Sequence, residues 1–244
     1  MNPVFLTAIG VGGATVFGGI IGFIIKRIPK RFSELTLSFA AGIMLAAAIW
    51  GLIIPSLGEG TLKETAVSVA GIVLGALFVS ACERLVPKLH FVADGDCDGE
   101  ELDSVLLLVL AIAIHNLPEG IAAGVSLGSG DVSGALSVAG GIALQNIPEG
   151  MVVVPPMLAV GISRRRTFFL ALFTGLSEVA GTFLGYQAVT FFSWLLPVAL
   201  AFAGGAMLYV IADEMIPRAR EEGKVATYIL LLGFCSMMLM NCLL

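Results

Sequence analysis

Eight long stretches with almost no charged residues constrain the fold of this chain more than any other feature of its sequence. Each supplies about 20 residues, which as a helix rising ~1.5 Å per residue crosses a hydrocarbon core of ~30 Å. Backbone groups in lipid must pair within their own segment, which favours helices. We therefore predict an all-α membrane protein with eight transmembrane helices in one domain over residues 1–244. The expected helices cover approximately 4–25, 35–58, 65–86, 104–128, 134–161, 167–188, 194–215 and 225–243.

The composition supports lipid as the surrounding medium. Apolar residues make up 58% of the chain, charged residues only 13%, and the mean hydropathy is +1.00, whereas soluble domains carry about 25% charged residues. The four cysteines have no spacing typical of a zinc knuckle or a disulfide framework, so we expect free thiols. The expected surroundings are a lipid bilayer, with no nucleic-acid partner and no prosthetic group. A homodimer is compatible with the sequence.

The distribution of lysine and arginine predicts the orientation of the helices. If alternate loops are assigned to opposite sides, one side holds Lys26, Arg27, Lys30, Arg31, Arg84, Lys88, Arg164, Arg165, Arg166, Arg218, Arg220 and Lys224. Only Lys63 lies on the other side. Because basic loops stay in the cytoplasm, we predict a multi-pass protein of the cell (inner) membrane with both termini outside.

Two segments far apart in the chain resemble each other. "FAAGIMLAAAIWGLIIP" at 39–55 matches "FAGGAMLYVIADEMIP" at 202–217 in its Phe, Gly, Met and Leu positions, and the last proline slips by one place. The segments start on opposite sides of the membrane in the predicted topology. This is the pattern of an inverted repeat, in which transporters place a binding site near mid-membrane at the repeat interface.

Carboxylates occur where the chain should be deepest in lipid. The stretch "AIAIHNLPEG" at 111–120 is followed thirty positions later by "GIALQNIPEG" at 141–150, and Glu178 lies inside a third apolar stretch. A carboxylate at the centre of a membrane helix costs about 2.5–3.5 kcal/mol on insertion scales. The chain accepts that cost at Glu119, Glu149 and Glu178, which is a strong indication of function.

The spacing of the polar residues predicts a metal site. His115 and Glu119 are four residues apart, so they share one helical face, and Asn116 flanks it. Gln145, Asn146 and Glu149 repeat this arrangement on the next helix. Pro118 and Pro148 should bend both helices at the polar residues. Imidazole, carboxylates and amides facing each other suit a divalent transition metal, and the absence of a thiolate cluster suits a metal that must leave.

Each residue also has a purely structural interpretation. His115 alone could bridge two helices by a hydrogen bond, and Gln145 and Asn146 could do the same between their helices. The glycines after the motifs are interpreted as packing residues. The acidic loop 90–103, with His90 and Cys97, is either a solvated loop or a place where metal is captured. Asp213 and Glu214, near the inner end of the seventh helix, are candidates for lining an exit.

The paired motifs "HNLPEG" and "QNIPEG" resemble the fourth and fifth helices of the ZIP (Zrt-, Irt-like protein) metal transporters. "FAAGIMLAAA", the short acidic loop and "LSEVAGTFLGY" at 176–186 are similar to the bacterial GufA-like branch. The resemblance extends over essentially the whole chain. It implies eight helices, outward termini and a site for two metal ions at mid-membrane.

The resemblance also implies a ligand set for each metal. The first metal would take His115, Glu119, Gln145 and Glu149, together with Met44 unless Met44 is an ordinary core methionine. The second would take Asn116, Asn146 and Glu178, with Glu119 and Glu149 bridging. Many family members carry His where this chain has Gln145, which leaves the metal preference open among zinc, iron, manganese and cadmium.

These observations predict a secondary transporter that moves a divalent transition metal, foremost Zn²⁺, into the cytoplasm. The chain has no GxxxxGK[ST] loop for ATP, so an ion gradient would drive transport. An intramembrane metal-dependent hydrolase of lipid phosphates is the alternative, although no Lys or Arg accompanies the polar residues to bind a phosphate. A channel-like cation pore would use the same residues.

Overall fold

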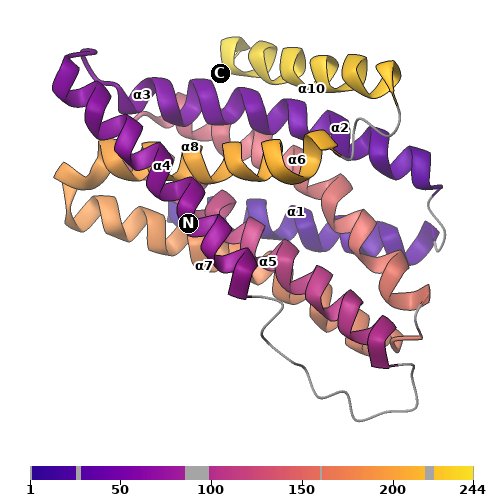
Figure 1. The fold of residues 1–244 in the computed structure, drawn as a ribbon. Helices are drawn as coiled ribbons and strands as arrows, with labels where there is room; N and C mark the ends of the chain where they lie inside the picture. Colours follow the sequence, from indigo (N-terminus) through magenta and orange to yellow (C-terminus); the bar gives the residue numbers. More distant parts are fainter. Residues whose placement is uncertain (1, 26–28, 86–98, 160, 218–222, 244) are drawn as a thin grey trace.

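The computed structural model describes residues 2–25, 29–85, 99–159, 161–217 and 223–243, which form eight helical rods and no strand (Figure 1). The rods, with their bounds, are α1 (Pro3–Ile25), α2 (Lys30–Ala46) continued by η1 (Ala47–Ile53) and α3 (Ile54–Ser56), α4 (Leu62–Leu85), α5 (Gly99–Gly128), α6 (Val132–Ala159), α7 (Arg164–Phe191), η3 (Ser193–Leu195) with α8 (Leu196–Val210) and η4 (Ile211–Met215), and α10 (Lys224–Leu243). Several rods begin before the apolar stretch itself. α2 starts at Lys30, for example, because a long basic side chain can reach water from a helix end.

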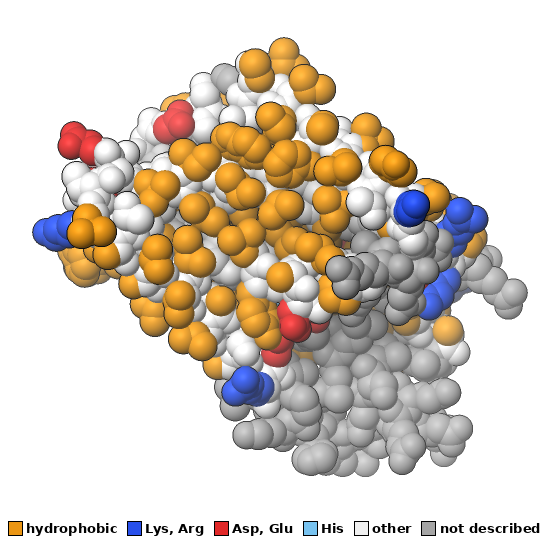
Figure 2. All heavy atoms as spheres, turned by 45° about the horizontal axis from the view of Figure 1, so that its top comes forward, with side chains coloured by type: hydrophobic (Ala, Val, Ile, Leu, Met, Phe, Trp, Pro, Cys, Tyr) orange, Lys and Arg blue, Asp and Glu red, His pale blue; other side chains and the backbone are white. Residues whose placement is uncertain are grey.

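The surface of the described residues is that of a membrane protein. Six helices there are long and apolar enough to cross a membrane: Pro3–Ile25, Lys30–Ser56, Leu62–Arg84, Arg164–Phe191, Ser193–Met215 and Lys224–Leu243. Large apolar side chains such as Ile24, Leu62 and Trp194 are strongly exposed. Figure 2 shows hydrophobic side chains over most of the visible face, with charged side chains at its margins. The remaining rods, α5 and α6, carry the two polar motifs.

The helices pack as two bundles. In the first bundle, α5 lies along α7, α1 lies along α6, and α1 also contacts α7. In the second bundle, α4 lies along α8 and α10 lies along α2, a pair that Figure 1 shows at one edge of the molecule. Contacts between the bundles, chiefly α2 with α6 and α5 with α8, are less extensive. The polar motifs of α5 and α6 therefore belong to one bundle, and Met44 belongs to the other.

The pairing of helices follows an inverted repeat. The sequence separation that relates Phe39 to Phe202, 163 residues, also separates Thr15 from Glu178. With α1 matched to α7, α2 to α8, α4 to α10 and α5 to α6, each extensive pair has a counterpart: α1 with α6 matches α7 with α5, and α2 with α10 matches α8 with α4. Two related halves thus surround the polar residues, as the sequence repeat predicts.

The glycine contacts repeat this symmetry at the level of single residues. A Cβ added to Gly18 of α1 would lie 2.0 Å from the Ile147 carbonyl oxygen, and one added to Gly181 of α7 would lie 2.4 Å from the Leu117 carbonyl oxygen. Gly18 and Gly181 are matched in the repeat, as are Ile147 and Leu117 in the two motifs. Because only glycine permits these backbone contacts, the helices of the first bundle pack very closely.

Both halves contain a π-helical turn at a related place. η1 follows Met44 within the 39–55 segment, and η4 contains Glu214 within the 202–217 segment. Such turns insert an extra residue per turn and often occur at functional sites. Pro118 and Pro148, where the sequence predicts bends, both lie inside continuous helices. The described π-helical turns are found on the helices that face the motifs rather than at the motif prolines.

Candidate metal centre

Glu178 of α7 organises one group of predicted ligands. Asn116 of α5 donates to its Oε1 at 2.5 Å, and Asn146 of α6 donates to its Oε2 at 2.5 Å. The hydroxyl of Thr15, on α1, donates to Oε1 as well. All four side chains are almost completely buried. The structure therefore brings Asn116, Asn146 and Glu178 together from three helices, and Thr15 supplies a further donor that the sequence did not single out.

The two asparagines are held in equivalent ways. Nδ2 of Asn116 also approaches the Thr174 carbonyl oxygen at 3.4 Å, and Nδ2 of Asn146 approaches the Val11 carbonyl oxygen at 3.3 Å. Val11 and Thr174 are matched residues of the inverted repeat. The amide nitrogens are thus directed at Glu178 and the backbone. In this arrangement the side-chain oxygens of both asparagines have no hydrogen-bond partner among the described residues.

Glu119 and Gln145 form a second group. Nε2 of Gln145, on α6, donates to Oε1 of Glu119, on α5, at 2.7 Å. Both side chains are buried, and neither Glu119 Oε2 nor Gln145 Oε1 has a hydrogen-bond partner within the described part of the chain. Glu119 interacts electrostatically with Glu149 and Glu178. Three carboxylates therefore lie near one another inside the bundle.

The glycine that follows each motif glutamate positions the carboxylates by close packing. A Cβ on Gly120 would lie 2.2 Å from the Glu178 carbonyl oxygen, and one on Gly150 would lie 2.0 Å from the Thr15 carbonyl oxygen. Any larger residue would push α5 away from α7, or α6 away from α1. These glycines therefore bring the helix that carries Glu119 against the helix that carries Glu178, consistent with their interpretation as packing residues.

A cavity of about 50 Å³ joins the two bundles at this level. Its lining residues are Leu37, Met44, Ile112, His115, Glu119, Glu149, Val152, Val153, Val210, Glu214 and Met215. The volume exceeds the ~30 Å³ that one water occupies in the liquid. Of the predicted ligands, Met44, His115, Glu119 and Glu149 all face this space. Met44 is otherwise fully buried, so it meets the carboxylates across the interface between the bundles.

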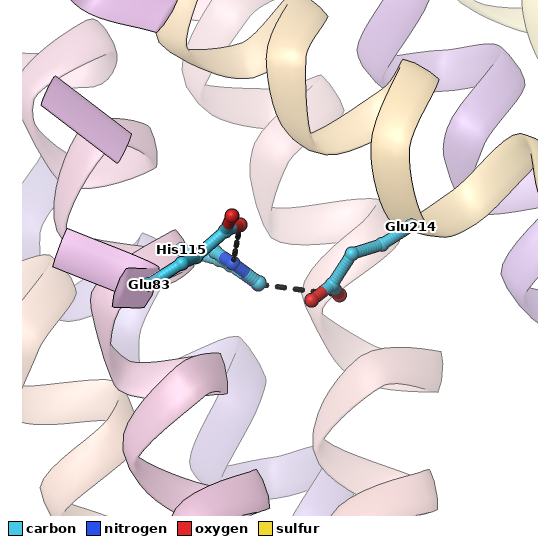
Figure 3. A group of neighbouring side chains, drawn as sticks. All are labelled: Glu83, His115 and Glu214. Atoms are coloured by element: carbon cyan, nitrogen blue, oxygen red, sulfur yellow. Dashed lines mark hydrogen bonds and ion pairs between the residues drawn. The ribbon is translucent and has the colours of Figure 1, made fainter. Parts of the chain in front are cut away.

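His115 has partners that the sequence analysis did not pair with it. Its Nε2 lies 3.1 Å from Oε1 of Glu83, on α4, and its Nδ1 lies 3.5 Å from Oε2 of Glu214, on η4. Figure 3 shows the imidazole between the two carboxylates. Glu214 was a predicted exit-lining residue, and it does line the cavity. Glu83 was missed because it stands at the end of an apolar stretch, where a charge is usually a boundary with water.

The electrostatics of the mid-membrane groups favour a cation. Four buried oxygens, on Asn116, Glu119, Gln145 and Asn146, lack a donor among the described residues. A buried acceptor without a partner costs about 1–3 kcal/mol, so four of them are too expensive for groups that only join helices. These four acceptors lie near several carboxylates, so a positively charged partner would satisfy them. Carboxylate, amide and imidazole groups are suitable ligands for divalent metals.

The remaining sequence expectations concern the ends of the molecule. The described basic residues Lys30, Arg31, Arg84, Arg164, Arg165, Arg166 and Lys224 all lie at one set of helix ends, which we call the basic end, and Lys63 lies at the other. Cys82, Cys235 and Cys242 are free thiols, as expected. His90 and Cys97 of the acidic loop lie outside the described residues.

Comparisons with known proteins agree with this geometry. A family model described as ZIP zinc transporter matches residues 93–241. The zinc transporter GufA of Myxococcus xanthus is 36% identical over 243 residues, which cover 96% of each chain. The zinc transporter ZIPB of Bordetella bronchiseptica is 34% identical and covers 93% of this chain and 77% of its own. The zinc transporter ZupT of Chlorobium luteolum is 34% identical and covers 87% and 86%.

Proposed function

Because this chain belongs to the ZIP family of metal transporters, in its GufA-like branch, we propose that it carries Zn²⁺ through the mid-membrane site into the cytoplasm. Divalent metal transport follows from family membership, and the protein is a transporter rather than a lipid-phosphate hydrolase. The relatives GufA, ZIPB and ZupT are all named as zinc transporters, which supports zinc as the substrate. The observation that carries the proposal is the set of four buried side-chain oxygens without donors among the described residues, three on amides and one on Glu119, close to the carboxylates of Glu149 and Glu178.

The grouping of side chains supports two metal positions. Met44, His115, Glu119 and Glu149 line the cavity, and Gln145 is bonded to Glu119. These are the ligands proposed for the first metal. Asn116, Asn146 and Glu178 form the second group through hydrogen bonds. Glu119 and Glu149 would bridge the two metal ions. Each of them lies in a motif, on α5 or on α6, that supplies ligands to both groups.

The packing on either side of the carboxylates supports release at the basic end. Toward that end the cavity continues past His115 to Glu214. Toward the opposite end the helices close over a fully buried apolar layer that includes Leu52, Ala122 and Val138. Among the described residues, the cavity therefore extends toward the basic end and stops at the apolar layer on the other side. With basic loops in the cytoplasm, this asymmetry supports an inward-facing state with both termini outside.

The contacts between the bundles support alternating access. Within the first bundle the glycines Gly18 and Gly181 contact backbone carbonyls, so that bundle moves as one body. Across the interface the contacts involve side chains: Gly51 faces the Val138 side chain, and Gly141 faces Met237. Methionine adapts its shape readily. The first bundle, with the motifs, would move against the second and expose the site to each side in turn.

An uptake measurement tests the proposal. Purified protein in sealed vesicles should accumulate Zn²⁺, and Glu149→Gln should reduce the initial rate at least tenfold because a shared carboxylate is lost. Glu59→Gln is the matched control, since Glu59 is exposed in the turn after α3 and should transport as the parent does. If Glu149→Gln carried zinc at the parental rate at equal protein content, the assignment of the site would be wrong. Flux that did not saturate with zinc would favour a channel.

A further inference from the structure

An apolar groove runs along the first bundle between α1 and α7. Its volume is about 270 Å³. The walls include Ile9, Phe17 and Ile20 of α1 and Leu172 and Leu176 of α7. Ile9, Phe17 and Leu176 are each more than half exposed, so the groove opens on the outer surface of two helices that are long and apolar enough to span a membrane. Acyl chains of the bilayer therefore have direct access to it.

Glycines create the groove. The two helices cross at Gly12 and Gly175, where a Cβ added to Gly12 would lie 2.4 Å from the Gly175 carbonyl oxygen and one added to Gly175 would lie 2.6 Å from the Gly12 carbonyl oxygen. Gly13, beside this crossing, lines the groove, and nothing lies within 4 Å of its added Cβ. Apolar walls offer water no partners, and an unfilled void loses dispersion contacts. An apolar chain is therefore the molecule that suits this space.

One face of α7 connects the groove with the basic end. This face is formed by residues at intervals of three or four along the helix, namely Arg165, Phe169, Leu172, Leu176 and Val179. The guanidinium carbon of Arg165 lies 6.0 Å from the centre of the Phe169 ring. Seven residues separate Arg165 from Leu172, which is about 10 Å along a helix. A cation therefore lies just beyond the groove, on the same face of α7.

The charge at this end of α7 suits an anionic headgroup. Arg164, Arg165 and Arg166 are all exposed, and none of them forms an ion pair with another described residue. Arginine binds a phosphate through two parallel hydrogen bonds, and anionic lipids attract basic residues near the membrane surface. Arg165 is on the face of the groove, whereas Arg166 lies about 100° further around the helix axis. Arg165 is therefore placed to bind the phosphate of a lipid whose acyl chain fills the groove.

Comparison with a second apolar groove shows what the arginine adds. That groove lies between α5, α7 and α8, has a volume of about 370 Å³ and is lined by residues such as Ile121, Leu184 and Phe202. Its lining residues on α7 lie in the half of the helix away from Arg165, so a lipid there would find no arginine of this group. The α1–α7 groove combines an apolar channel with a cation, as an anionic phospholipid requires. Both of its walls belong to the first bundle, so the groove persists when that bundle moves against the second.

We propose that the α1–α7 groove and Arg165 bind one anionic phospholipid from the leaflet at the basic end. An acyl chain would lie in the groove against Gly13, and the phosphate would accept hydrogen bonds from the Arg165 guanidinium. The site goes beyond the proposed function, because it uses none of the proposed metal ligands and does not require that zinc be transported. It assigns a bound lipid to the bundle that carries the metal-binding motifs.

Native mass spectrometry of the delipidated protein in detergent tests the headgroup contact. Phosphatidylglycerol and phosphatidylcholine with the same acyl chains are titrated separately, and the affinity of the first bound lipid is measured. The parent should bind phosphatidylglycerol about fivefold more tightly, the preference expected from one arginine near an anionic lipid. Arg165→Gln should lose this preference. Arg166→Gln is the matched control, since it removes the same charge from the next residue, off the groove face, and it should keep the preference.

Gly13→Leu tests the groove itself. It should weaken the binding of both lipids severalfold, because the leucine side chain takes the space of the acyl chain. Gly10→Leu is the matched control and should bind as the parent does, since nothing lies within 4 Å of an added Cβ at Gly10 either, and Gly10 does not line the groove. Equal binding of the two lipids by the parent, or the same behaviour of both members of either pair of variants, would refute the site and leave zinc transport untouched. A dimer in the spectrum that Gly13→Leu dissociates would also refute it, because a second copy of the chain would then occupy the groove.

Discussion

Thr15 and Glu178 occupy matched positions in the two halves of the inverted repeat, and the hydroxyl of the first donates a hydrogen bond to the carboxylate of the second. The symmetry of the fold thus brings a carboxylate and a hydroxyl to the place where two related helices meet. Only one of the two matched residues is charged. The first bundle therefore contributes three carboxylates to the mid-membrane centre instead of four, which limits the negative charge that bound metal must balance.

Thr15→Val removes this hydrogen bond with little change in volume. We expect metal affinity to fall about tenfold to a hundredfold, the range seen when a partner of a ligating side chain is lost, because Glu178 loses a donor that orients it. Zinc binding to the purified protein, followed by calorimetry, measures the effect. Thr190→Val, at an exposed position where the hydroxyl bonds the Tyr186 carbonyl, should bind as the parent does. Equal affinity for both variants would show that Thr15 has no role in binding.

Gly18→Ala should destabilise the first bundle. The new methyl would lie 2.0 Å from the Ile147 carbonyl oxygen, in a contact made with backbone rather than with a movable side chain. Overpacking of this kind costs about 1–3 kcal/mol, so thermal unfolding in detergent should begin at a lower temperature. Gly13→Ala is the control on the same helix, since nothing lies within 4 Å of its added Cβ. Similar melting of the two variants would contradict the close packing of α1 on α6.

The positions of these residues explain which parts of the molecule could be predicted from sequence. Glu119, Glu149 and Glu178 lie inside apolar stretches, where a charged side chain is costly and therefore indicates function, and the two motifs repeat at a fixed spacing. The helices could be predicted from the apolar stretches, and the mid-membrane polar centre from the carboxylates within them. Glu83 and Thr15 carry no such signal. A glutamate at the end of a span is ordinary, and a threonine in a glycine-rich helix becomes informative only when its neighbour across the interface is known.

The local helix geometry could not be predicted in the same way. The sequence indicates bends at Pro118 and Pro148, where proline removes a backbone donor. The described π-helical turns lie in η1 and η4, which contain no proline. A π turn depends on one extra residue that the packing around it accommodates, and this cannot be predicted from composition. The related feature in the sequence is the one-place offset of the final proline between 39–55 and 202–217.

Gln145→His should shift the metal preference toward zinc. Gln145 now donates to Glu119 and presents an amide oxygen, whereas imidazole is a better ligand for zinc than for manganese. We expect the ratio of zinc to manganese affinity to rise about tenfold, roughly the 1.4 kcal/mol that corresponds to such a ratio. Competition binding of the two metals to purified protein measures it. Gln187→His adds an imidazole at an exposed position of α7 and should leave the ratio unchanged. A ratio that did not rise in Gln145→His would argue against Gln145 as a ligand.

Zinc binding should release protons, and it should weaken as the pH falls. Carboxylate and imidazole ligands bind metal only without their protons, so protons and zinc compete at Glu119, Glu149 and His115. Acid favours the protonated ligands, and the apparent dissociation constant for zinc therefore rises as the pH falls. Titration of zinc into weakly buffered protein at several pH values, with a pH indicator present, measures the protons released per metal. Glu149→Gln cannot take up a proton at that position and should release fewer. Binding that is independent of pH, with no proton release from the parent, would exclude these carboxylates as the ligands.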